Sequence, residues 1–415
     1  MKSDQKNIDR VWLSIFITAI IILTTLPYLV AFANQGNSWQ FTGFLFGVED
    51  GNSYLAKMQR GGAGEWLFRL AYSARPGQGS LAFFPFLLLG KLAGGEEQHL
   101  QLVILFHLLR IAGVVFSGLI LYRFISLYNL EPADKRWALS LIVLGGGLGW
   151  IMLFFENRGW VQWLPLTFYS PESFGFLAFY GLPHLLFGRG FLFWGWVFIL
   201  GEETRFAGLK GGLSWLVMGL FQPLFIIICW SVSGGFLMLL FLIKRFHQHQ
   251  NHTVLWADRF GPLVKRMAGA GLITLPLLIY YLLVFLLNSP ISRWQGQAFS
   301  LSPSVLEYAL AYGLMIPFAV LFLVWKKMEL SIREWMLVSW LVIGPILVSL
   351  PFNFQRRLAE GYWVVLIVLA VLAVSAHSAR NPSKWRWLWV GAFPGTLILF
   401  WGTLMGARNP GLPLF

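Results

Sequence analysis

The sequence predicts an all-α integral membrane protein, and three observations support this class. Charged residues make up only 12% of the 415 residues, whereas a soluble protein keeps about a quarter of its residues charged. The mean hydropathy is +0.66, and apolar runs long enough to cross a bilayer recur along the chain. Aromatic residues reach 17%, with 21 Trp, a residue favoured at membrane interfaces. We expect one transmembrane domain over residues 1–415, embedded in membrane lipids.

About 11 membrane-spanning helices are predicted from the apolar runs. The first run is expected to be a retained helix because it lacks the small-residue exit of a cleaved signal peptide. The run over 211–243 is too long for one span, and we expect two helices that meet at Gln222-Pro223. The predicted spans are 11–33, 99–122, 137–155, 176–200, two within 211–243, 266–287, 305–325, 334–350, 361–378 and 387–406.

The distribution of Lys and Arg predicts an N-in, C-out topology. Of the 31 basic residues, 19 lie in loops on the side of the N-terminus and 10 on the opposite side, and cytoplasmic loops carry the excess. Because the basic residues separate apolar runs, the net charge of +13 reflects topology, and no nucleic-acid partner is expected. Segment 34–98 becomes a long external loop. Its apolar patch over 81–94 is too short to span and is expected to be an interfacial or re-entrant helix.

The adjacent carboxylates Glu49 and Asp50 are the first candidates for chemistry. In an external loop against the membrane, such a pair can take a proton from an attacking hydroxyl, hold a divalent cation such as Mg²⁺ or Mn²⁺, or bond sugar hydroxyls. The following Gly51-Asn52 equally fits a solvated turn. The pattern leaves these alternatives open.

A basic and aromatic stretch follows in the same loop, with Lys57, Arg60, Arg69, Tyr72 and Arg75. Positive charge on the side that membranes disfavour suggests an anionic lipid headgroup or a phosphate as partner. Side chains that only snorkel to the interface would give the same pattern.

A second basic motif, FQRRLAEG, contains Gln355, Arg356, Arg357 and Glu360 between two short spans. Two arginines just outside the membrane can bind a phosphate through several N–H donors. Glu360 would neutralise one of these two arginines or bond substrate, and a structural ion pair within the motif is the other interpretation.

Polar residues within or at the ends of spans form the third group. His184 and Arg189 share a span, and ionisable groups at this depth usually face a cavity. Arg189 would otherwise pair with Glu172 or with Glu49–Asp50, and His184 would be a packed core histidine. Gln222 stands at the helix break, where broken helices line cavities; a plain proline kink is the other interpretation. The predicted topology places most of these residues on the external side.

Taken in order, these features resemble the GT-C class of membrane glycosyltransferases. The resemblance lies in VEDGNSYLAKMQRG with its acidic pair, the expected interfacial helices GEWLFRLAYS and LAFFPFLLLGKLAG, the broken pair GLSWLVMGLFQPLFIIICW, and the motifs LPHLLFG and LPFNFQRRLAEG. It covers essentially the whole chain, although each motif is degenerate. Many members carry an external soluble domain after the last span. This chain stops at GARNPGLPLF, just after the last predicted span, so we expect either that the domain is absent or that the sequence is truncated.

The resemblance implies a sugar donor on a polyprenyl-phosphate carrier and a glycan, lipid or protein acceptor. Transfer would occur on the external face of the plasma (inner) membrane, with inversion at the anomeric carbon. Asp50 or Glu49 would be the general base, and in a metal-dependent member the pair would hold the divalent metal. The expected substrate-binding residues are Tyr54, Arg75, His184, Arg189, Gln222, Gln355, Arg356, Arg357 and Glu360.

Two other classes fit parts of the pattern. A transporter or lipid flippase would explain the broken helices and the intramembrane His184 and Arg189, but it predicts internal repeats and polar residues that reach both faces. Neither is evident in the sequence. A non-catalytic membrane subunit, with Glu49–Asp50 as a turn, is the third class.

Overall fold

The structure is a computed structural model that describes residues 2–37, 39–70, 77–154, 164–201, 204–249, 257–287, 289–297, 299–326, 329–377 and 387–409. These residues form helices and connecting loops with no β-strand among them. The α-helices are α1 Lys2–Ala33, α2 Val48–Gly62, α3 Phe84–Gly90, α4 Gln98–Ile125, α5 Pro132–Leu144, α6 Leu166–Tyr169, α7 Phe176–Gly181, α8 Pro183–Gly201, α9 Ala207–Phe221, α10 Leu224–His249, α11 Ala257–Leu287, α12 Ser289–Gln297, α13 Val305–Tyr312, α14 Ile316–Trp325, α15 Ile332–Val348, α16 Tyr362–His377 and α18 Pro394–Arg408. Short 3-10 helices are η1 Gly149–Phe154, η3 Gln355–Ala359 and η5 Trp387–Ala392.

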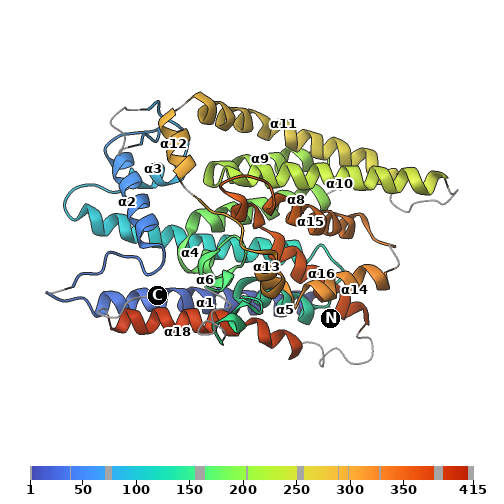
Figure 1. The fold of residues 1–415 in the computed structure, drawn as a ribbon, viewed down its shortest axis with the longest axis horizontal. Helices are drawn as coiled ribbons and strands as arrows, with labels where there is room; N and C mark the ends of the chain where they lie inside the picture. The colour runs from blue at the N-terminus through green and yellow to red at the C-terminus, as the bar shows by residue number, and fades with distance from the viewer. Residues whose placement is uncertain are drawn as a thin grey trace.

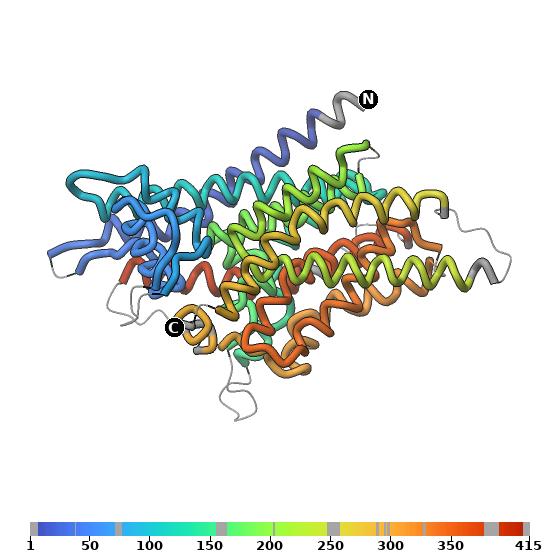
Figure 2. Tube along the Cα trace, turned by 90° about the horizontal axis from the view of Figure 1, so that it is seen from above, coloured from blue at the N-terminus to red at the C-terminus, as the bar shows by residue number. Residues whose placement is uncertain are grey.

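The long helices lie side by side along the longest axis of the molecule (Figures 1 and 2). Seven described helical segments are long and apolar enough to cross a membrane, and the bent pair α13–α14 would make an eighth. The chain is therefore an all-helical, multi-pass membrane protein. The prediction of about 11 spans included shorter helices, such as α9 and α15, that this length criterion leaves out.

Helix α16 is the centre of the bundle. In the apolar 18-residue stretch of Gln355–Ala376, 94% is buried inside the protein. The corresponding stretch of Asp258–Leu287 is only 17% buried. A helix that is apolar on all sides and buried by protein belongs to the core. The α11 stretch leaves most of its apolar surface uncovered by protein, as expected for a helix that faces lipid.

Three of the predicted spans are broken in the structure. A fourth break, between two predicted spans, was expected from the sequence. Helix α5 ends at Leu144, where the GGGLG motif begins; a Cβ on Gly147 would lie 1.7 Å from the Ala311 carbonyl oxygen. The motif therefore allows close backbone approach. The span predicted over 305–325 bends by 72° between α13 and α14, and that over 176–200 breaks between α7 and α8. The predicted break at Gln222-Pro223 is confirmed, because α9 ends at Phe221 and α10 begins at Leu224.

Arginines at one end of the bundle cap helix C-termini, whose exposed carbonyls carry partial negative charge. Arg333 donates to the carbonyls of Leu200, at 3.2 Å, and Leu127, at 2.7 Å. Arg266 donates to the carbonyl of Ile199 at 2.8 Å. These arginines come from loops predicted to be cytoplasmic.

Loops that the sequence assigned to opposite sides lie at opposite ends of the bundle. The first turns of α1 lie at one end, and α2, α3 and α12 lie at the other (Figure 1). Which end is cytoplasmic stays a prediction.

The segment between α1 and α4 differs from the predicted loop. Glu49 and Asp50 lie in the first turn of a 15-residue helix, α2. The interfacial helix expected over 64–73 is wrong for its described part, in which Phe68 pairs with Ser80 through two backbone hydrogen bonds of 2.8 and 2.9 Å. The patch over 81–94 contains the seven-residue helix α3, which is too short to span.

Candidate functional site

The acidic pair occupies the N-terminus of α2. Gly47 precedes the helix in the left-handed region at φ 58°, and no side chain caps the first turn. Glu49 and Asp50 are exposed, and their charges are favourable beside the helix N-terminal dipole. The helix dipole explains why acidic residues are tolerated here. Both carboxylates are exposed at the surface, and neither is bonded to a described residue.

Asp50, Tyr54 and Lys57 lie on one face of α2, because spacings of four and three residues place side chains one above the other. The Tyr54 ring is buried and stacks on Phe86 of α3, with centroids 4.4 Å apart. Its hydroxyl lies 3.4 Å from Nε2 of His184. Burial, and secondarily the Asp50 carboxylate, raise the pKa of Tyr54, so the phenol stays protonated.

Lys57 lies in an aromatic cage that the sequence did not indicate. Its Nζ is 4.2 Å from the ring centroid of Phe83, 5.1 Å from that of Tyr54 and 5.7 Å from that of Phe68. It donates to the carbonyl and hydroxyl oxygens of Ser53. Burial lowers the pKa of Lys57 to about 8, and the Asp50 carboxylate partly opposes this shift. The residue was predicted only as one of several basic loop residues.

His184 begins α8 and faces the same region. Its Nδ1 is buried and has no hydrogen-bond partner among the described residues, while Arg357 and Lys57 both lie close enough to act on its charge. Gln222, at the break between α9 and α10, is buried beside α8: a Cβ added to Gly188 would meet the Cβ of Gln222 at 3.4 Å. Gln222 thus lies about one helical turn from His184 along α8.

The η3 segment supplies the cationic side of the cluster. Arg357 donates from Nε to the Ser300 hydroxyl at 3.2 Å, and its charge reaches Tyr54. The Arg356 guanidinium lies 4.7 Å from the ring centroid of Tyr169, and within the described part of the chain its buried Nε has no acceptor. Gln355 accepts from the backbone N–H of Ser302 at 3.0 Å, which anchors the segment before α13.

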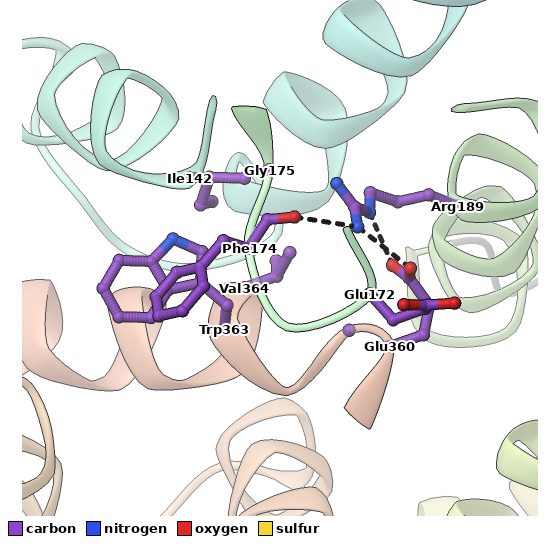
Figure 3. Close-up of a pocket in the computed structure, with 9 residues that line it drawn as sticks. Ile142, Glu172, Phe174, Gly175, Arg189, Glu360, Trp363 and Val364 are labelled. Carbon is purple, nitrogen blue, oxygen red and sulfur yellow. Dashed lines mark hydrogen bonds and ion pairs between the residues drawn. The ribbon is translucent and has the colours of Figure 1, made fainter. Parts of the chain in front are cut away.

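Arg189 and Glu360 form a buried ion pair with each other (Figure 3). Arg189 donates from Nε and Nη2 to the two carboxylate oxygens, at 2.5 and 2.9 Å, and from Nη2 to the carbonyl of Pro171 at 2.8 Å. The pocket around the pair, which Glu172 also lines, has no room for a water molecule. The expected pairing of Arg189 with Glu172 or with Glu49–Asp50 is therefore wrong, because its guanidinium is bonded to Glu360, a partner that the sequence did not indicate for it. The roles of Arg189 and Glu360 in substrate binding stay predictions.

The structure thus brings most of the predicted residues to one region, and some residues fall elsewhere. Tyr54 is the common neighbour: its hydroxyl contacts His184, and both Asp50 and Arg357 lie within electrostatic reach of it. Arg75 lies outside the described residues, as does Tyr72. Arg60 pairs instead with Glu65 at 3.1 Å on the surface.

The described part of the chain contains no group of three or more His, Cys, Asp or Glu side chains that could hold a metal ion. Glu49 and Asp50 alone would supply two carboxylates, and a hard divalent cation needs six or more oxygen ligands. Substrate phosphate and water would have to provide the others. Metal dependence therefore stays a prediction for a chelator experiment.

Comparison with known proteins adds no family. The chain matches none of the protein-family models and none of the curated proteins with which it was compared. The fold and the site define the class by themselves: a multi-pass helical membrane protein with a cluster of ionisable and aromatic side chains near α2, the start of α8 and η3.

Proposed function

We propose that the protein is a GT-C-type membrane glycosyltransferase, which moves a sugar from a polyprenyl-phosphate carrier to a glycan, lipid or protein acceptor. One observation carries the proposal: a free carboxylate, Asp50, shares a cluster with the cations Arg357 and Lys57, although α2, α8 and η3 are far apart in the sequence. Glycosyl transfer from a lipid phosphate needs a base for the acceptor and positive charge for the leaving phosphate.

In the proposed reaction Asp50 takes the proton of the acceptor hydroxyl. The acceptor oxygen forms a bond to the anomeric carbon as the bond from that carbon to the phosphate oxygen breaks. The electron pair leaves with the polyprenyl phosphate, whose charge grows, so a cation beside it stabilises the transition state more than the ground state. Arg357 and the unpaired Nε of Arg356 are the donors placed for this role.

The other predicted residues take supporting roles in this proposal. Glu49 orients the acceptor or joins Asp50 in holding Mg²⁺ or Mn²⁺. Tyr54 donates from a phenol that stays protonated, and His184 and Gln222 line the same side of α8. The site would face the external side of the plasma (inner) membrane, in agreement with the predicted topology.

The test is turnover by purified Asp50→Asn with labelled polyprenyl-phosphate sugars. A missing general base lowers the rate by about 100- to 10,000-fold, and release of polyprenyl phosphate should fall by that factor while Asp50→Asn folds normally, because the side chain is exposed. Glu131→Gln is the matched control, since it removes an exposed carboxylate that, like Asp50, lies at a helix N-terminus but is outside the cluster. Near-normal turnover in Asp50→Asn would refute the assigned role.

The same preparation separates the alternatives. Movement of lipid across sealed vesicles without bond cleavage identifies a flippase or transporter. Loss of turnover in a chelator, restored by Mg²⁺ or Mn²⁺, identifies a metal-dependent enzyme. No release of polyprenyl phosphate by the wild type from any donor tested would overturn the proposed function.

A further inference from the structure

Glu172 is a buried carboxylate that the proposed mechanism does not use. It lies between α6 and α7 and is 6% exposed. Arg189 donates from Nη2 to the carbonyl oxygens of Pro171 and Phe174, which fixes the backbone on both sides of Glu172. Figure 3 places Glu172 beside the Arg189–Glu360 pair, yet no described residue donates a hydrogen bond to its carboxylate or forms an ion pair with it.

The only cation beside Glu172 in this view, Arg189, is already engaged. Its Nε and Nη2 donate to both oxygens of Glu360 and to backbone carbonyls. Two buried carboxylates therefore lie beside one guanidinium, which donates to Glu360 and leaves Glu172 without a donor among the described residues. A buried carboxylate without donors is costly, and such groups persist where a ligand supplies the missing hydrogen bonds.

The surroundings of Glu172 indicate the kind of ligand. The carbonyl oxygen of the next residue, Ser173, accepts from the Tyr312 hydroxyl at 3.4 Å, and the Tyr312 ring stacks on that of Tyr308 in α13. The Tyr308 hydroxyl is 3.3 Å from the Ser302 hydroxyl, and nearby Tyr169 stacks against Arg356. The region thus combines one carboxylate acceptor with half-buried phenol rings and lies next to the arginines assigned to the phosphate.

A carboxylate repels phosphate and accepts hydrogen bonds from hydroxyl groups. Apolar and aromatic surface with a few placed polar groups is the usual composition of a small-molecule site. We propose that Glu172 is a sugar-binding residue, whose carboxylate accepts hydrogen bonds from hydroxyl groups of the transferred sugar while Arg356 and Arg357 hold the phosphate. The pocket on the Arg189 side has no room for a water molecule, so the sugar approaches from the side of Tyr308. This assignment rests on the proposed function.

The test compares Glu172→Gln with Glu360→Gln in the full-length protein. Glu172→Gln removes a carboxylate that accepts no hydrogen bond from a described residue. The thermal midpoint of the ligand-free protein should therefore stay the same or rise. Glu360→Gln removes half of a satisfied pair, so its midpoint should fall. With the labelled donor, Glu172→Gln should lower kcat/KM about 10- to 100-fold, as expected for a lost hydrogen bond to a charged group, while Glu131→Gln should match the wild type.

Stabilisation of the wild type by a panel of methyl glycosides gives a readout that does not depend on turnover. The expected result is a rise in thermal midpoint with at least one glycoside, lost in Glu172→Gln. A wild type that binds glycosides through Glu172 but never releases polyprenyl phosphate refutes the glycosyltransferase and keeps the sugar site. Unchanged kcat/KM in Glu172→Gln overturns the sugar site alone. A midpoint that responds to Mg²⁺ or organic amines but not to glycosides, with the response lost in Glu172→Gln, also overturns it.

Discussion

Removing the Glu360 carboxylate should destabilise the bundle strongly. Arg189 is 2% exposed and Glu360 is completely buried, and the pair joins α8 to the turn before α16, the central helix. Glu360→Ala leaves a guanidinium buried with only backbone carbonyls as acceptors. Breaking a buried pair in this way typically costs about 3–5 kcal/mol, and we expect a loss in that range.

A double variant measures the interaction between Arg189 and Glu360 separately from the effect of each residue alone. Replacing both partners with apolar residues, as in Arg189→Met with Glu360→Met, removes both desolvated charges, and such replacements are often neutral or stabilising. We therefore expect the double variant to be more stable than either single variant, with a coupling energy of about 2 kcal/mol or more. Glu172 should contribute less than Glu360 to the stability difference between the single and double variants, because Glu172 is not bonded to Arg189.

Unfolding in mixed SDS micelles, followed by tryptophan fluorescence, measures these differences. Trp340 is a local reporter, because its ring packs against Gly361, directly after Glu360. The exposed pair Arg60–Glu65 is the control, with side chains 50% and 31% exposed; Glu65→Ala should cost less than about 1 kcal/mol. A loss below about 1 kcal/mol in Glu360→Ala, or additive effects in the double variant, would refute the reasoning.

Two further predictions concern α2. Because Lys57 has a folded pKa of about 8 and an ordinary value of 10.5, the unfolded chain binds more protons between these pH values. The free energy of unfolding should therefore rise by on the order of 2 kcal/mol from pH 8 to 10, and Lys57→Met should lack this component in parallel denaturation series. A Cβ on Gly61 would lie 1.9 Å from the Leu87 carbonyl oxygen, so Gly61→Ala should force α2 and α3 apart and lower the thermal midpoint, whereas Gly94→Ala, which has open space, should not; equal midpoints in the two variants would contradict this contact.

The sequence predicts elements well where one local signal decides the outcome. The break between α9 and α10 follows from Pro223, which cannot continue a helix, and α3 is short because its apolar run is short. The bend of 72° between α13 and α14 also has a local signal, which the prediction of one span over 305–325 did not use. Pro317 lies in the first turn of α14 and has no N–H to bond the carbonyl of Gly313, the residue after α13, so one continuous helix cannot form there. Apolar composition alone does not distinguish a straight span from a bent pair.

Partners of the site residues were harder to predict than their location. Shared topology was enough to expect Asp50, His184 and Arg357 in one region. The partner of Arg189 is separated from it by 171 residues, and several carboxylates were chemically equivalent candidates. Lys57 is buried by aromatic rings that come from other parts of the segment, so its local sequence gives no sign of its environment.

The buried charges of this chain divide into two kinds, and the division supports the placement of the site. Glu360 uses its full bonding capacity on Arg189, and their pocket is closed to water, as expected of a structural pair. Glu172 is 6% exposed and accepts no hydrogen bond from a described residue, and the buried Nε of Arg356 has no acceptor among them. A hydrogen-bond acceptor, Glu172, and a hydrogen-bond donor, the Nε of Arg356, thus lie near the rings of Tyr169 and Tyr308 without hydrogen-bond partners of their own among the described residues. A substrate that carries both hydroxyl groups and a phosphate would satisfy both, and a sugar linked to a lipid phosphate is such a molecule.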